Sequence, residues 1–214
     1  MLAPAGALEE GRRRVLRATS RASVSGPGRW MILDGYLKPY ASVRHTHYGV
    51  DAALQLRKRH AILPKQIRGI ALSVYPEAIT YCGNRQPKTA IQAQFSLTYA
   101  IAAALCLGDL GPEAYGDALF DADIVRLERL ATITPDLQRV GRGAKLSLDV
   151  GGAVHHQDVA SVLGDPGRPM TAADAREKFL RYAQPTLNAA QARAIVAALL
   201  AGAPDTPVRK LFDL

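Results

Sequence analysis

The sequence contains few cysteines, few aromatic residues and no long apolar run, and each shortage excludes a class of protein. Of its 214 residues two are cysteines, Cys82 and Cys106, and neither belongs to a Cys-x-x-Cys pair. Zinc sites, iron–sulfur clusters and disulfide scaffolds need more cysteines at closer spacing. We therefore predict no metal and no other cofactor, and isolated thiols fit the reducing environment of the cytoplasm.

The longest apolar run is YAIAAALCLG from Tyr99. It has about half of the roughly 20 residues that a membrane span needs, so we interpret it as a buried helix and expect no membrane partner. Hydrophobic residues make up 48% of the chain and charged residues 21%. This is the composition of an ordinary globular protein, and the length allows one large domain or two small ones.

The formal net charge is +8, but half of it lies near the N-terminus. The first 29 residues carry six arginines and two glutamates, which is +4. The rest has no long basic run and only four Phe and one Trp that could stack on bases. Nucleic-acid binding is thus an alternative that rests on composition alone, and we predict no nucleic-acid partner.

Hydrophobic periodicity and turn residues predict an α+β fold, a small mixed domain with an antiparallel sheet followed by C-terminal helices. The expected strands lie near residues 70–74, 130–135, 144–150 and 154–159, and Gly151 and Gly152 join the last two into a hairpin. The expected helices lie near residues 46–60, 91–108, 124–129, 171–183 and 188–202. We expect a flexible basic leader at 1–30, an α+β domain at 31–164 and a helical segment at 165–214.

The stretch KPYASVRHTH, residues 38–47, crowds Lys38, Arg44, His45 and His47 into ten residues. We expect Thr46 to cap the helix that follows, so that the cations stand just before a helix N-terminus, where an anion is favoured. Proton transfer next to a carboxylate needs such positive charge, together with a group that titrates near neutrality. The stretch therefore fits a carboxylate site that moves a proton.

The alternative is that the stretch is only a basic surface turn. Neighbours at i and i+2 on a helix do not share a face, so His45 and His47 need not act together. The pair His155 and His156 is a poorer candidate for a site, because adjacent strand residues point to opposite faces of a sheet. Spacing alone leaves both interpretations open.

Four ordered blocks resemble the C-terminal region of the MmgE/PrpD family. They are KPYASVRHTHYGVDAALQLR, YCGNRQPKTAIQAQFSLTYAIAAAL, LERLATITPD and GDPGRPMTAADAREKF, with its Gly-Asp-Pro, Pro-Met and Lys-Phe marks. The resemblance covers roughly residues 30–201. The family includes 2-methylcitrate dehydratase, an enzyme of propionate catabolism, as well as cis-aconitate decarboxylase and iminodisuccinate epimerase.

The resemblance implies a lyase-type activity on a small di- or tricarboxylate, by proton transfer without a metal. It implies an α+β domain next to a helical domain, with the active site in the cleft between them. Lys38 matches the family's active-site lysine, and Arg44 and His45 match the Arg-His pair beside it. The implied catalytic residues are Lys38 and His45, and the implied substrate-binding residues are Arg44, His47, Tyr81 and Asn84.

The sequence departs from the family in three places. Ala41 replaces a usual proline, residues 1–29 match nothing familiar, and the chain is about half as long as full members. We therefore expect weak or no activity without a helical half, and either a homodimer or a separate partner chain that carries that half. A non-catalytic carboxylate-binding module is the alternative. Dehydration, decarboxylation and epimerisation are not distinguished, nor is the substrate.

Overall fold

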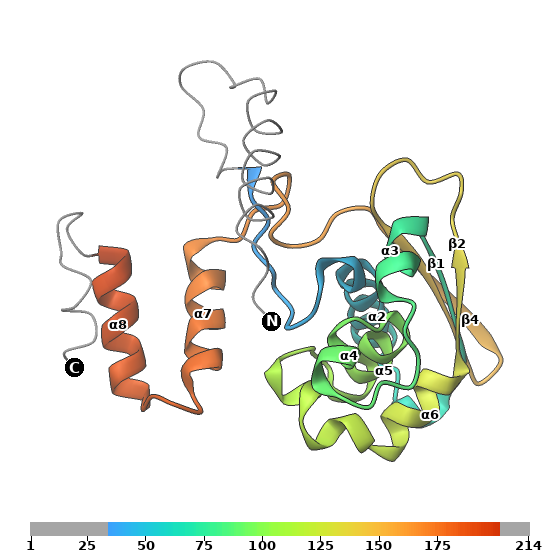
Figure 1. The fold of residues 1–214 in the computed structure, drawn as a ribbon, viewed down its shortest axis with the longest axis horizontal. Helices are drawn as coiled ribbons and strands as arrows, with labels where there is room; N and C mark the ends of the chain where they lie inside the picture. Colours follow the sequence, from blue (N-terminus) through green and yellow to red (C-terminus); the bar gives the residue numbers. More distant parts are fainter. Residues whose placement is uncertain (1–33, 202–214) are drawn as a thin grey trace, which may run out of the picture. The chain divides into compact units, whose positions relative to one another are not determined.

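The computed structural model describes residues 34–201, in which helices cover one face of a four-stranded sheet (Figure 1). The strands are β1 (Ile67–Val74), β2 (Ala131–Pro135), β3 (Ala144–Val150) and β4 (Ala153–Val159), in the spatial order β2-β1-β3-β4. Strand β1 buries Ile70, Leu72 and Val74, while Ala71 between them is exposed. This period-2 pattern is expected for a sheet with one covered face.

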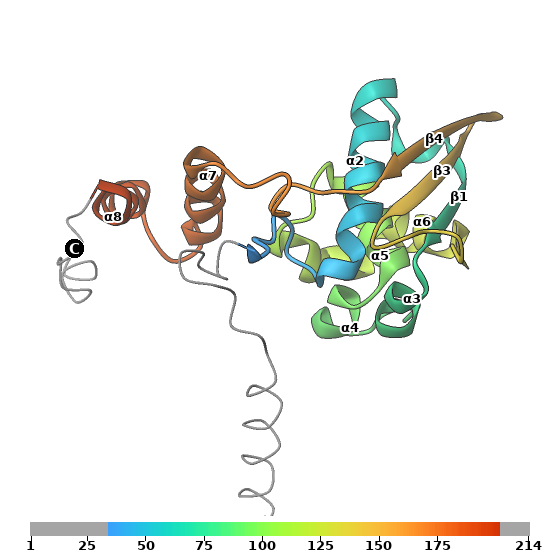
Figure 2. The same ribbon diagram turned by 90° about the horizontal axis from the view of Figure 1, so that it is seen from above.

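The helices that cover the sheet are α2 (His47–His60), α5 (Leu97–Leu107) and α6 (Ala122–Leu130) (Figure 2). Two short helices, α3 (Pro76–Cys82) and α4 (Ala90–Gln94), precede α5, and a helical pair, α7 (Ala172–Ala183) and α8 (Ala189–Ala201), ends the described chain. Single 3₁₀ turns occupy Arg44–Thr46, Pro64–Gln66, Pro112–Tyr115 and Asp117–Phe120.

The predicted α+β class is confirmed, but the sheet is mixed and not purely antiparallel. Strand β1 pairs with β3 antiparallel and β3 with β4 antiparallel, whereas β1 and β2 run parallel. A parallel pair needs a crossover of a dozen or more residues. Helices α3 to α6 supply that crossover between β1 and β2.

The strongest local sequence signals are confirmed. Gly151 and Gly152 both have positive φ, +61° and +95°, as a two-residue hairpin turn requires. The Thr171 hydroxyl accepts from the Asp174 N–H, and the Asp174 carboxylate accepts from the Thr171 N–H, so the capping box of α7 is present. Helix α5 ends at Gly108 with a φ of +80°.

Two predictions about helices were wrong. The pattern at 91–108 is not one helix, because Phe95 and Ser96 interrupt it and the Ser96 hydroxyl caps α5 by accepting from the Tyr99 N–H at 3.2 Å. Thr46 does not cap α2, since its backbone is already helical and its hydroxyl donates back to the Val43 carbonyl. Arg44 and His45 lie in the 3₁₀ turn that leads directly into α2.

The hydrophobic core lies between the sheet and helices α2, α5 and α6, and its buried residues run from Tyr48 to Val162. No described residue of α7 is fully buried. On α8 a few apolar residues are covered, but Leu199 and Leu200 remain exposed. The predicted domain boundaries stay predictions, and the predicted leader at 1–30 lies outside the described residues. Within residues 34–201, no helix combines the length and the apolar character that crossing a bilayer requires.

Candidate functional site

The segment from Tyr36 to Val43, which carries Lys38, is held in place by backbone hydrogen bonds to three distant parts of the chain. The N–H of Leu37 donates to the Gly164 carbonyl at 3.2 Å. The N–H of Ala41 donates to Leu110 at 2.9 Å, and that of Val43 donates to Gln94 at 3.2 Å. An irregular segment tied at three points presents its side chains in a fixed place.

His47 lies beneath this segment and is fully buried. Its Nε2 is 3.2 Å from the Ser42 carbonyl, which can only accept, so Nε2 carries the proton. Its Nδ1 then accepts from the Tyr36 hydroxyl at 2.5 Å. Burial, more than any other cause, lowers the pKa of His47 to about 4. The imidazole is thus neutral at pH 7, and both nitrogens hold the segment and do not face a ligand.

His47 should make the folded protein lose stability in acid. Its pKa is near 6.5 when unfolded and about 4 when folded, so the unfolded state binds more protons between these values. Stability should fall as the pH drops from 6.5 to 4, by about 3 kcal/mol from this residue. Urea unfolding of the wild type and of His47→Gln, which can keep both hydrogen bonds, measures the difference.

The control for this experiment is His156→Gln, at an exposed histidine of the β3–β4 hairpin. Other titrating groups contribute equally to all three proteins and cancel in the comparison. The wild type and His156→Gln should share the steep acid loss, and His47→Gln should be flatter. Equal pH dependence in all three would show that His47 is protonated without cost.

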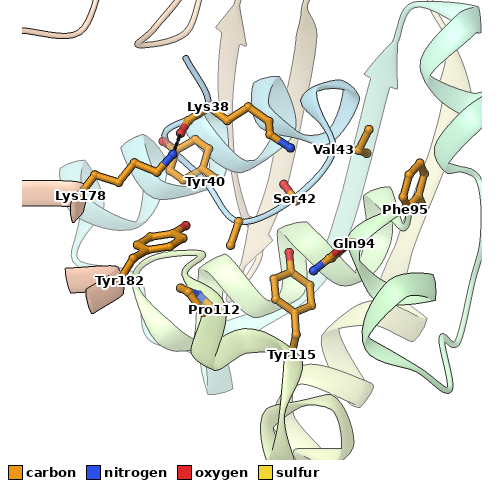
Figure 3. A pocket seen from close by; sticks show the side chains of 11 residues that line it. Lys38, Tyr40, Ser42, Val43, Gln94, Phe95, Pro112, Tyr115, Lys178 and Tyr182 are labelled. Carbon is orange, nitrogen blue, oxygen red and sulfur yellow. Dashed lines mark hydrogen bonds between the residues drawn. The ribbon is translucent and has the colours of Figure 1, made fainter. Parts of the chain in front are cut away.

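A pocket of about 450 Å³ opens beside this segment, a volume usual for small-molecule sites (Figure 3). It combines two lysines with tyrosines, small residues and one amide, and no lining residue is acidic. The lining residues are Lys38, Tyr40, Ala41, Ser42, Val43, Gln94, Phe95, Pro112, Tyr115, Lys178 and Tyr182. Two ammonium groups without a carboxylate form a setting for an anion.

Lys178 reaches the pocket from α7, far away in the sequence. Its Nζ donates to the backbone carbonyl of Lys38, and Figure 3 shows the Lys38 ammonium extending away from that contact, over Ser42 and Val43. Burial first, and then the charge of Lys38, lower the pKa of the Lys178 ammonium. The second cation of the pocket is therefore an amine whose proton is held less tightly than usual.

Two hydroxyl groups in the pocket are buried without a partner. The oxygens of Tyr115 and Tyr182 make no hydrogen bond to any described residue and are out of contact with solvent. Figure 3 shows the Tyr115 hydroxyl pointing toward Ser42. An unpaired buried hydroxyl costs about 1–3 kcal/mol. Because solvent does not reach either oxygen, a ligand in the pocket could accept from these hydroxyls only after the tyrosine side chains turn toward it.

Arg44 lies near the pocket but is engaged elsewhere. Its Nη2 is 2.5 Å from Oδ1 of Asp165, and its guanidinium carbon lies 4.1 Å from the centre of the Tyr36 ring. Asp165 also accepts from the Val162 N–H at 2.9 Å. The arginine thus links the 3₁₀ turn to the loop around Asp165, and its assignment to a substrate carboxylate stays a prediction.

His45 belongs to a second group of side chains, on the side of α3. Its Nδ1 is 2.7 Å from the Tyr75 hydroxyl, and its ring stacks on Tyr81 with centroids 5.3 Å apart. Burial is the main cause that lowers the pKa of His45. Asn84, at the loop after α3, donates its amide to the Gln92 carbonyl at 3.2 Å. The structure therefore brings His45 and Tyr81 together, and Asn84 makes no hydrogen bond with either among the described residues.

Of the six residues that the sequence singles out, Lys38 alone lines the pocket. Sequence reasoning missed Lys178, Tyr115 and Tyr182, and a signal existed for the first of these. Lys178 is the lysine of the Lys-Phe mark in the last family-like block. Its separation from Lys38 by 140 residues hides the contact, because nothing in the sequence shows where α7 packs.

Comparison with known proteins agrees with this fold. The model of the MmgE/PrpD C-terminal domain matches residues 40–201, well over half of the chain, and Lys38 stands just ahead of the matched range. No curated protein matches the chain. Because one family model extends over the sheet, the covering helices and the α7–α8 pair, the chain belongs to the MmgE/PrpD family and carries its C-terminal domain.

Proposed function

We propose that the pocket at Lys38 binds a small di- or tricarboxylate and that the chain is part of a lyase-type enzyme. The reaction would transfer a proton next to a carboxylate, as in 2-methylcitrate dehydration. The observation that carries this proposal is a 450 Å³ pocket with two lysines and no acidic residue. Membership of the MmgE/PrpD family supports it.

The chemistry follows from where charge develops. Removing a proton next to a carboxylate places negative charge on that group, and an ammonium held beside it stabilises this charge. Lys38 is the proposed proton carrier or carboxylate contact, since it stands on the segment held at three points. Tyr115 and Tyr182 are proposed to turn their buried, unpaired hydroxyls toward the same anion when it binds.

Replacing Lys38 by methionine should weaken carboxylate binding about tenfold or more, because one charge-assisted hydrogen bond is worth roughly 1.5–3 kcal/mol. Titration of the purified chain with 2-methylcitrate and cis-aconitate, followed by NMR, measures the affinity. Lys145→Met, at an exposed position on β3, removes the same charge elsewhere and should have little effect. Equal affinities for all three proteins would refute the assignment of the pocket.

Measuring turnover distinguishes two roles of Lys38, proton transfer and contact with a carboxylate. If Lys38→Met abolishes turnover and keeps binding, the lysine transfers the proton. If both are lost together, it is a carboxylate contact. Dehydration, decarboxylation and epimerisation are separated by the product that forms.

The second candidate is a carboxylate-binding module without catalysis. It is favoured by the engagement of Arg44 with Asp165 and of His45 with Tyr75, which leaves neither of them lining the pocket. Binding of 2-methylcitrate without turnover, in a folded protein, would decide for this candidate.

We also propose that the chain works with a partner, either a second copy or a separate helical chain. Leu199 and Leu200 are 56% and 58% exposed on α8, and Ile91 is 61% exposed on α4. Contiguous apolar patches mark interaction surfaces, so the proposal rests on the neighbouring Leu199 and Leu200. Light scattering of the purified chain should give a mass above the 23.0 kDa of one copy if the partner is a second copy.

A further inference from the structure

Helix α7 is attached to the pocket by polar contacts. The Arg181 guanidinium donates to the carboxylates of Asp109 and Glu113, next to the 3₁₀ turn that carries Tyr115. One turn of helix earlier, Lys178 donates to the Lys38 carbonyl. Because α7 buries no residue fully, these contacts, and not core packing, place it against the pocket.

Lys178 has hydrogen-bonding capacity to spare. An ammonium has three donors, and its one hydrogen bond to a described residue goes to the Lys38 carbonyl. Its charge also lies 5.4 Å from the centre of the Tyr182 ring, whose hydroxyl is unpaired. Donors and positive charge are therefore available on this side of the pocket, next to a tyrosine that lacks an acceptor.

The two lysines repel each other, and no acidic lining residue offsets that repulsion. A ligand with one carboxylate can neutralise one of them. A ligand with two carboxylates can neutralise both, and the ion pair at the half-buried Lys178 gains more Coulomb energy than a pair in bulk water would. Charge therefore favours a dianion over a monoanion of similar size.

We propose that Lys178 is a specificity-determining residue of this pocket, which binds a second carboxylate and so makes the pocket select anions with at least two carboxylates. This inference rests on the proposed function and extends it to a residue on α7. Lys38 and Lys178 then hold the two ends of one ligand in a pocket that Tyr115 and Tyr182 also line. The lowered pKa of Lys178 supports this, because a bound carboxylate restores the affinity of the amine for its proton.

The test compares succinate with butyrate, which have the same four carbons and differ by one carboxylate. NMR titration of the wild type at pH 7 should give an affinity for succinate about tenfold or more above that for butyrate. Lys178→Gln keeps a donor for the Lys38 carbonyl but has no charge. It should lose most of this preference while its affinity for butyrate changes less than about twofold.

Two further variants separate charge from structure. Arg176→Gln removes one positive charge from the same helix at an exposed position and should leave the preference intact. Lys178→Arg keeps the charge and should keep most of the preference. If Lys178→Gln and Arg176→Gln behave alike, or if Lys178→Arg loses as much as Lys178→Gln, the inference is wrong.

The pH profile of the wild type gives a readout that does not depend on folding of a variant. The carboxylates of succinate are fully ionised above pH 7, so a loss of affinity in alkali reports the protein. Since the pKa of Lys178 is lowered, succinate binding should begin to weaken at a lower pH than an ordinary lysine would give, and butyrate binding should not follow. Parallel profiles for the two ligands would overturn the inference.

Two outcomes distinguish the role of Lys178 from the proposed function of the pocket. If the wild type binds 2-methylcitrate but shows no preference for succinate over butyrate, Lys178 does not set the charge of the ligand and the pocket assignment stands. If no carboxylate binds to the wild type at all, the proposed function falls with it.

Discussion

Replacing Gly164 by alanine is expected to lower the free energy of unfolding by about 3 kcal/mol or more and to displace the segment that carries Lys38. Gly164 has a φ of +94°, which residues with a Cβ rarely adopt. A Cβ there would lie 1.9 Å from the Leu37 carbonyl oxygen, and that neighbour is backbone. The segment could not move aside without losing the hydrogen bond from the Leu37 N–H to the Gly164 carbonyl.

Gly167→Ala provides the matched control, three residues further along the same loop. A Cβ at Gly167 would meet no atom within 4 Å, and its φ is outside the left-handed range. Its effect on stability should stay within about 0.5 kcal/mol, as for most surface substitutions. Urea unfolding of both variants gives the stabilities, and titration with 2-methylcitrate reports the Lys38 segment. Similar losses in both variants would contradict the close approach at Gly164.

The parts of the fold that the sequence predicts well are those set by neighbouring residues. The Gly151–Gly152 turn and the capping box of Thr171 and Asp174 depend on local backbone geometry and on side chains a few residues apart. The break at Phe95 and Ser96 was missed because apolar residues continue on both sides of it. In the structure α4 ends at Gln94, and the Ser96 hydroxyl caps the beginning of α5.

The candidate site was predicted only in part, for a different physical reason. Lys38 was identified from a local cluster of cations and histidines, and it does line the pocket. The same cluster led to the prediction of His47 as a substrate-binding residue, but this histidine is buried and its two hydrogen bonds hold the segment that carries Lys38. Charge density in a sequence does not show which side chains turn inward. Lys178 and Tyr182 enter the pocket through the packing of α7, which depends on ion pairs of Arg181 with Asp109 and Glu113. Such long-range pairs leave no periodic pattern.

The second large effect is expected at Glu128, a residue that is only 2% exposed, which is rare for glutamate. Its Oε1 accepts from the Thr98 hydroxyl at 2.7 Å and from the Gln86 N–H at 3.2 Å. Arg85 lies 4.0 Å from the same oxygen and donates to the Glu128 carbonyl at 3.1 Å. These contacts connect the loop after α3, which carries Asn84, to helix α6.

Glu128→Ala should therefore lower the free energy of unfolding by about 2–3 kcal/mol, because it leaves the buried Thr98 hydroxyl and the Gln86 N–H without their acceptor. Glu128→Gln keeps an acceptor for the Thr98 hydroxyl and loses only the charge, so its loss should be smaller. Glu177→Ala, at an exposed glutamate of α7, is the control and should change stability little. Urea unfolding ranks the three, and hydrogen exchange of residues 83–90 shows whether the loop loosens.

Glu128→Ala should also affect ligand binding in the pocket. The loop tied by Glu128 leads into α4, whose last residue, Gln94, lines the pocket and accepts the hydrogen bond from the Val43 N–H. Loosening the loop should thus weaken 2-methylcitrate binding in Glu128→Ala even under conditions where the protein stays folded. Unchanged affinity with faster exchange at 83–90 would mean that α4 is held by its own contacts, and that the pocket wall is independent of the buried glutamate.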